Sequence, residues 1–264
     1  MSNLHLSFLW GGALLLAVLG STAAQTGDSR TPLQRRIEIQ KQRLSSGEAE
    51  ERRDALMKLG LMRRPEASRA AAASLNDADA SVRVAAAHAV VSASSPDAVA
   101  ALTPLLQDKL EFVRREVAYA LGETGSREAI APLTNLLSTD KEMSVRAAAA
   151  VALGKIKDEA AAVALAKAID DHPPKKKLGE YDFVRRAAIE ALGETRSPAG
   201  VPVLISALGN EANSLDVRRA AVVALGKIGS GSAVPALQTA FQSNDPYLAE
   251  AAREALRRMH APLK

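Results

Sequence analysis

Cysteine is absent from this chain of 264 residues. Its absence excludes disulfides, thiolate nucleophiles and cysteine-ligated metals, but leaves the compartment open, because an exported protein does not need a disulfide. Aromatic residues make up only 3% of the chain, whereas hydrophobic residues, many of them alanine, make up 47%. Alanine and leucine favour helices, while strands favour β-branched and aromatic residues. The composition therefore predicts an all-α protein.

A strong excess of one charge is also lacking. The chain has 34 basic and 30 acidic residues, a net charge of +4. These charges are interspersed along the predicted helices and form no block, a pattern typical of solvated helix faces. A stripe of Lys and Arg that would follow a phosphate backbone is not evident, so no nucleic-acid partner is expected.

Long apolar runs are missing except near the start of the chain. An apolar run covers 8–19, and Thr22 and Ala24 lie at positions −3 and −1 of a cleavage site before Gln25. This layout predicts a signal peptide at 1–24, although no Lys or Arg precedes the run. The run is shorter than the ~20 residues of a membrane-spanning helix. Export to the periplasm or the exterior is expected, and an uncleaved membrane anchor and a cytoplasmic chain with an apolar tail remain the alternatives.

A repeated phrase organises the rest of the sequence. Residues 112–126 and 183–197 match at ten of fifteen positions. The pair Val-Arg recurs five times, and Ala-Leu-Gly follows four of these pairs. The pairs lie at 82–83, 113–114, 145–146, 184–185 and 217–218. "ALGET" alternates with "ALGKI", which indicates duplication of a block of two repeats. A period of 31 to 39 residues is typical of a solenoid.

Each repeat is predicted to contain two short helices. In the third repeat, Val113, Val117 and Leu121 form one apolar stripe, and a second stripe follows in 130–137. Gly122 is expected to end the first helix in the left-handed conformation. Phe112 and Phe183 are expected to help one repeat pack on the next. Neither helix buries its stripe alone, so stacked pairs would form a continuous core.

The recurring Val-Arg, Ala-Leu-Gly and Ala-x-x-x-Leu pattern resembles the short HEAT-like repeats named after phycobilisome lyases, over roughly 46–260. The resemblance implies a right-handed α-α superhelix of about six helix pairs with a C-terminal capping helix. It also implies a buried ladder in which an Asp six residues before each repeat's Arg links neighbouring repeats. The matching residues are Asp77 with Arg83, Asp108 with Arg114, and Asp140 with Arg146. Gly179 and Ala212 hold the equivalent positions before Arg185 and Arg218, for which Glu180 and Glu211 are the expected partners.

The two ends and one insertion complete the predicted organisation. Residues 25–46 form a linker and an N-terminal capping helix, with Thr31 as its N-cap and Pro32 as its first residue. The solenoid covers 47–260, and Asp245 and Pro246 start its last helix. The segment 171–182 reads as a protruding basic loop, since Pro173-Pro174 cannot continue a helix.

Residues for catalysis or metal binding are not recognisable. The histidines are His5, His88, His172 and His260, and no spacing among them matches a metal site. Relatives that hydroxylate a modified lysine hold iron through paired His-Glu motifs, and this chain has no His-Glu dipeptide. We therefore expect no catalytic residue, no metal and no cofactor.

The expected function is that of an exported, non-catalytic, monomeric scaffold for an unidentified protein partner. Two surfaces are candidates for contact with it. One is a row on the second helices, formed by Asn135, Lys167, Ser206 and Thr239 beside Pro104. The other is the basic loop, where Lys175, Lys176 and Lys177 would meet an acidic partner or the headgroups of an anionic membrane. The alternatives are a bilin-lyase-like or hydroxylase-like enzyme and, third, a nucleic-acid-binding HEAT-like protein.

Overall fold

The structure, a computed structural model, describes residues 29–91, 97–170 and 178–263. These residues form α-helices and short 3-10 turns, and no strand occurs among them. The helices are α1 (Pro32–Arg43), α2 (Ala49–Leu61), α3 (Pro65–Ala72), α4 (Ala80–Val91), α5 (Asp97–Leu102), α6 (Glu111–Glu123), α7 (Ile130–Thr139), α8 (Met143–Ile156), α9 (Glu159–Asp170), α10 (Leu178–Thr195), α11 (Val201–Gly209), α12 (Leu215–Ile228), α13 (Val234–Phe241) and α14 (Pro246–Arg258).

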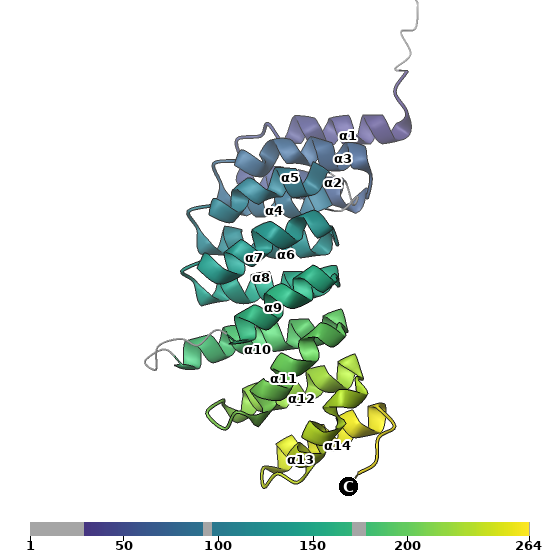
Figure 1. The fold of residues 1–264 in the computed structure, drawn as a ribbon. Helices are drawn as coiled ribbons and strands as arrows, with labels where there is room; N and C mark the ends of the chain where they lie inside the picture. Colours follow the sequence, from purple (N-terminus) through teal and green to yellow (C-terminus); the bar gives the residue numbers. More distant parts are fainter. Residues whose placement is uncertain (1–28, 92–96, 171–177, 264) are drawn as a thin grey trace, which may run out of the picture.

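The helices stack in one row from α1 to α14 (Figure 1). Each odd-numbered helix from α3 to α13 packs mainly on the even-numbered helix that follows it, which gives six pairs after α1 and α2. The Val-Arg helix is therefore the second helix of its pair, whereas the sequence predicted it to be the first. One apolar core runs through the whole array, built largely from alanine, leucine and valine. The predicted all-α solenoid is confirmed. Its long, thin core explains why so few aromatic residues are needed.

The two ends follow the predicted capping rules. Thr31 accepts a hydrogen bond from the backbone N–H of Gln34, whose side chain accepts one from the backbone N–H of Thr31, so the two form a capping box. Asp245 caps α14 by accepting from the N–H of Leu248 at 2.7 Å. In both helices a proline occupies the first helical position, where its missing N–H costs nothing.

Glycines within the even-numbered helices set the distance between neighbouring repeats. A Cβ added at Gly154 would lie 2.8 Å from the Cα of Ala191, and one at Gly122 would lie 2.7 Å from the Cα of Ala152. Both glycines lie inside their helices, so the expectation that Gly122 ends its helix in the left-handed conformation is wrong. The left-handed residue in that repeat is Gly125, with φ of 62°. The Ala-Leu-Gly pattern is therefore required for close helix packing, not for helix termination.

The second repeat departs from this pattern. Val91 occupies the position that corresponds to Gly122, and it packs at the edge of the core. The interface between α4 and α6 is the least extensive among neighbouring even-numbered helices. A valine side chain keeps two helix backbones apart where glycine lets them touch, which accounts for the difference.

The even-numbered helices lie on the inner side of the solenoid. Neighbouring even-numbered helices share extensive contacts, whereas neighbouring odd-numbered helices touch only at a few points. A stack of helix pairs curves toward the side on which the helices approach most closely. The even-numbered, second helix of each pair therefore faces the inside of the curve, and the odd-numbered, first helix faces the outside.

Part of the predicted loop is helical. The helix α10 begins at Leu178, so 178–182 belongs to this helix, while 171–177 lies outside the described residues. Lys175, Lys176 and Lys177 lie outside the described residues. The additional first turn of α10 carries Tyr181, whose ring lies 5.2 Å from the guanidinium of Arg146. The helix thus begins at Leu178, before the end of the predicted loop at 182, and the contact between Tyr181 and Arg146 lies in this additional turn.

Candidate partner-binding groove

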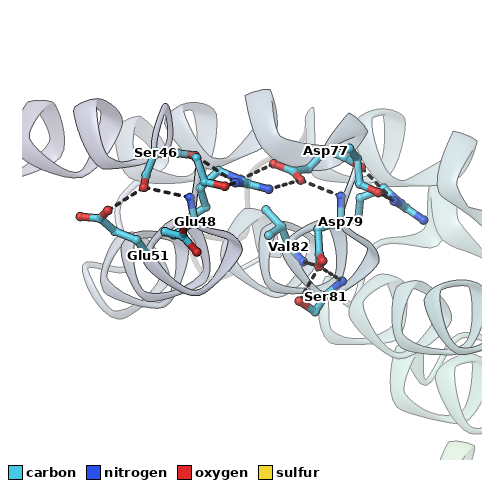
Figure 2. A network of polar contacts seen from close by, with 11 residues as sticks. Ser46, Glu48, Glu51, Asp77, Asp79, Ser81 and Val82 are labelled. Atoms are coloured by element: carbon cyan, nitrogen blue, oxygen red, sulfur yellow. Dashed lines mark hydrogen bonds and ion pairs between the residues drawn. The ribbon is translucent and has the colours of Figure 1, made fainter.

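Aspartate and arginine link the repeats of the N-terminal half. Arg52 donates from Nε and Nη2 to the carboxylate of Asp77, with both distances 2.8 Å. The same Asp77 accepts from the backbone N–H of Asp79 at 2.8 Å, which holds the turn that leads into α4 (Figure 2). Because Nη1 of Arg52 also donates to the carbonyl of Ser46, one guanidinium connects two successive turns. Bidentate pairs of this kind are the strongest arginine–carboxylate contacts.

Two further pairs repeat this arrangement. Arg83 pairs with Asp108 at 2.8 Å, and Arg114 pairs with Asp140 at 2.7 Å. Each arginine thus binds the aspartate of the next repeat, while Nη1 donates to the backbone carbonyl of the aspartate in its own repeat. The predicted ladder matched each aspartate with the arginine six residues later, whereas each carboxylate binds the arginine of the preceding repeat, which brings in Arg52 as a member that was not predicted. Arg52 lies 25 residues before Asp77, the same separation as between Arg83 and Asp108.

The carboxylates of this ladder are stabilised in their charged form. The hydrogen bonds from Arg52 hold the pKa of Asp77 below its usual range. For Asp108 and Asp140, burial is the largest influence and raises the pKa. The hydrogen bonds from Arg83 and Arg114 and from backbone N–H groups outweigh it, so the pKa of each is lowered. The charged pairs therefore belong to the folded state.

The arginines of the C-terminal half have different partners. Arg146 and Arg218 donate from Nε to the carbonyls of Leu137 and Leu208, within their own repeats. Arg185 donates to the carbonyl of Ile169 and, from Nη1, to Oδ1 of Asn213 at 2.9 Å. For Arg218 the hydrogen bond to Leu208 stands where Glu211 was expected, and the side chain of Glu180 lies outside the described residues.

A groove of about 700 Å³ lies on the inner side, across α8, α10 and α12. Its lining includes apolar side chains that rise from all three helices: Val151, Gly154, Ala187, Ala191, Ala220 and Val223. The close approach of Gly154 to Ala191 keeps this floor smooth. Val151 and Val223 remain 36% and 43% exposed, so the floor offers apolar surface to a partner.

Charged side chains surround this floor. Lys155, Lys157, Arg186, Arg219 and Lys227 contribute five cations, and Glu190, Glu194 and Asp216 contribute three carboxylates. Each of these carboxylates has a basic partner, namely Arg186 for Glu190, Lys227 for Glu194 and Arg219 for Asp216. Every carboxylate of the groove is thus already paired with a cation. These paired charges around an apolar floor suit electrostatic recognition of a partner.

The alternation of "ALGET" and "ALGKI" has a structural counterpart at one end of this groove. Lys155 forms an ion pair with Glu123 of the preceding repeat, and Lys227 forms one with Glu194. The glutamate and lysine therefore pair within each block of two repeats. Between the blocks, at the α8–α10 junction, charges of both signs line the groove. Lys155 and Lys157 come from the α8 side, and Glu194 comes from α10.

The row predicted for partner binding lies elsewhere. Asn135, Lys167, Ser206 and Thr239 are all exposed, each on its own odd-numbered helix, and therefore on the outer side. The predicted row and the groove thus occupy opposite sides of the solenoid. The groove was not predicted from the sequence, although small residues recur two, six and eight positions after Arg146, Arg185 and Arg218.

The two phenylalanines of the repeated phrase differ. Phe112 is partly buried against the core, as predicted. Phe183 is 47% exposed at the start of α10, so its predicted role in packing one repeat on the next is wrong. It lies on the face of α10 that carries Ala187 and Glu190, at helical spacing from the groove.

The described part of the chain contains no group of three or more His, Asp or Glu side chains that could hold a metal ion. His88, on α4, faces Glu116 of α6 at 3.5 Å, away from the groove. Within the same residues, no helix combines the length and apolar character needed to cross a membrane.

A sequence profile of HEAT repeats matches 37–121, 110–177 and 179–257. The chain belongs to the HEAT-repeat family. The predicted likeness to phycobilisome-lyase repeats is confirmed at the level of the repeat and its fold. A comparison with curated proteins gave no match.

Solved structures with this fold come from several sources. The Escherichia coli protein YibA is 21% identical, with a TM-score of 0.56, over 87% of this chain and 82% of its own. The CpcE–CpcF complex of phycocyanin lyase from Nostoc is 23% identical, with a TM-score of 0.50, over 91% and 97%. Human deoxyhypusine hydroxylase is 20% identical, with a TM-score of 0.44, over 85% and 84%. At these identities the likeness establishes the fold alone.

Proposed function

We propose that this HEAT-repeat protein is an exported, non-catalytic scaffold that binds a polypeptide partner along its inner side. The groove across α8, α10 and α12 carries the proposal. It combines exposed apolar side chains with charged groups around them, as protein interfaces combine an apolar centre and a polar rim. Export is supported by the apolar run at 8–19 and the small residues before Gln25.

The groove favours binding over chemistry for a physical reason. A general acid or base needs a free carboxyl group with a pKa suited to proton transfer. Glu190, Glu194 and Asp216 instead have cationic partners, and the pKa of Glu194 is lowered, first by the hydrogen bond from Lys227. A lyase-like or hydroxylase-like enzyme remains the alternative function, in keeping with the two enzymes of similar fold.

Site-specific photo-crosslinking tests the proposed surface. A photoreactive amino acid replaces Val223 in the groove or, as the matched control, Val163, which is exposed on the outer helix α9. In the native host, the Val223 position is expected to yield a discrete adduct with another polypeptide, whereas the Val163 position is not. A discrete adduct from Val163 and none from Val223 would place binding on the outer side and contradict the proposal.

N-terminal sequencing of the protein recovered from its host tests the second part. A start at Gln25 is the expected result, because it shows that residues 1–24 were removed on export. A chain that retains Met1 in the cytoplasmic fraction would refute export while leaving the binding surface to the crosslinking experiment.

A further inference from the structure

The two ends of the groove differ in chemistry. At the C-terminal ends of α8, α10 and α12 it is bordered by Lys155, Lys157 and Lys227, with Glu194 among them. Lys157 directly follows α8 and has a left-handed backbone conformation, with φ of 55°. Its side chain therefore does not continue along the helix surface. The pKa of Glu194 is lowered by the hydrogen bond from Lys227 and further by the charges of Lys157 and Arg196. Cations therefore dominate this border.

The opposite border carries Arg186, Asp216 and Arg219, and exposed apolar side chains lie beyond it. Near the N-terminal ends of α10, α12 and α14, Phe183, Leu215 and Tyr247 are left exposed. Tyr247 is 70% exposed, and the guanidinium of Arg219 lies over its ring, 5.5 Å from the ring centre. Arg219 in turn pairs with Asp216, so the aromatic ring and the groove are connected. Large apolar side chains that gather at a surface commonly mark an interaction site.

The inner side of the N-terminal half is not equivalent. Counted from each repeat's arginine, the positions of Ala187 and Ala220 correspond to Asp54, Ala85 and Glu116, and the position of Val223 corresponds to Met57, His88 and Tyr119. All of these except Ala85 are larger or more polar, and His88 bridges to Glu116 of the next helix at 3.5 Å. An apolar floor between charged borders is therefore a property of the groove region.

We propose that the groove binds a short polypeptide segment in which acidic and aliphatic side chains are combined. This inference rests on the proposed function and names the chemistry of the partner. Aliphatic side chains of the segment lie on Val151, Ala187 and Val223, while its carboxylates meet the lysine border. Glu123 and the three carboxylates of the groove pair with four of its five cations, which leaves the positive charge of Lys157 for an acidic segment to neutralise. Such complementarity gives specificity and speeds association.

The dimensions set the length of the segment. Helices pack about 8–10 Å apart, so three neighbouring helices span about 20 Å. An extended chain rises about 3.3 Å per residue, so about six residues cross from α8 to α12. The groove volume of about 700 Å³ accommodates the side chains on one face of such a segment.

Selection from a phage-displayed library of random dodecapeptides on the full chain tests the inference. Peptides retained by the unaltered protein but lost on Val223→Arg are then synthesised with a fluorescent label, and their affinities are measured by anisotropy. Two control variants on the outer side match the changes in the groove. Val163→Arg controls for Val223→Arg, and Lys167→Gln controls for the double variant Lys155→Gln, Lys157→Asn. Asn is chosen at 157 because it tolerates the left-handed backbone.

The expected peptides carry more Asp and Glu than Lys and Arg, interspersed with Leu, Ile, Val or Phe. Their affinity should fall at least tenfold for each groove variant, stay unchanged for both controls, and weaken with added salt. Circular dichroism melting curves confirm that the variants are folded. If Val223→Arg unfolds the protein, the double lysine variant compared with Lys167→Gln still tests the inference.

Peptides that depend on the groove but are basic or uncharged would overturn this inference and leave the proposed function standing. Recovery of no groove-dependent peptide, or of peptides lost only on Val163→Arg or Lys167→Gln, would overturn both.

Discussion

The two halves of the solenoid use the same buried arginine in different ways. In the first half, Arg52, Arg83 and Arg114 each reach across to an aspartate of the next repeat. In the second half, Arg185 binds the side-chain amide of Asn213 in the next repeat, and Arg218 donates from Nε to the carbonyl of Leu208 on the preceding helix. The Val-Arg motif is the same in both halves, so the acceptor that lies within reach decides which bond the arginine forms.

Helix packing is loosest at the start of the array. A Cβ at Gly60 would find Ala89 at 3.4 Å, an ordinary distance, whereas Cβ atoms at Gly154 and Gly193 would lie 2.8 Å and 2.9 Å from the neighbouring Cα. The α6–α8 junction, which the Arg114–Asp140 pair links, is packed as closely, with a Cβ at Gly122 2.7 Å from the Cα of Ala152. An ion pair between repeats is therefore compatible with the closest helix packing.

The size of the side chains on the inner side explains where the groove lies. In the second half, close packing through glycine and alanine leaves a low floor that apolar residues of three consecutive helices line. In the first half, larger side chains fill the inner side. Stability and the binding surface of the second half therefore depend on the same small residues.

The largest effect is expected from removing an acceptor of the ionic ladder. Asp140→Ala leaves the buried Arg114 without its carboxylate, and loss of one partner of a buried pair costs about 3–5 kcal/mol. The counterpart in the other half, Asn213→Ala, removes one hydrogen bond to Arg185 and should cost about 1.5–3 kcal/mol. Urea denaturation followed by circular dichroism measures both. Equal losses would show that the two halves do not differ in this respect.

The next largest effect is expected from filling the close helix contact. Gly154→Ala places a methyl group 2.8 Å from the Cα of Ala191, and the resulting overpacking should cost about 1–3 kcal/mol. Gly60→Ala should be near neutral, because its methyl group meets only ordinary contacts. Gly209→Ala, which meets nothing within 4 Å, is the control for helix propensity. Thermal melting compares the three, and a Gly60→Ala variant as unstable as Gly154→Ala would contradict the comparison.

The smallest effect is expected from mild acid. The pKa values of Asp77, Asp108 and Asp140 are lowered in the folded state, so their contribution is complete above the unfolded value of about 4 and is lost as the pH falls through the folded values. Between pH 6 and 4 little should change. Toward pH 3, amide hydrogen exchange should accelerate in α2 to α6 more than in α11 to α13. Uniform acceleration would mean that the ladder does not distinguish the halves.

Much of the fold was predictable from local patterns. The recurring Val-Arg and Ala-Leu-Gly pairs predict the number of helix pairs, and Thr31 and Asp245 predict the helix starts at both ends. These features depend on residues within one or two helical turns. The role of Gly122 was not predictable in the same way, because glycine serves both helix ends and close packing, and only the neighbouring helix shows which applies.

The sequence by itself determined that the chain forms stacked helix pairs, since apolar stripes with a period near 32 residues cannot be buried otherwise. Only the tertiary structure decided which helices face inward, which aspartate each arginine binds across 25 or 26 residues, and where small residues from α8, α10 and α12 meet to form the groove. The physical reason is that these properties arise between repeats. They depend on how closely two helices approach, and this distance is set jointly by a glycine in one repeat and an alanine in the next.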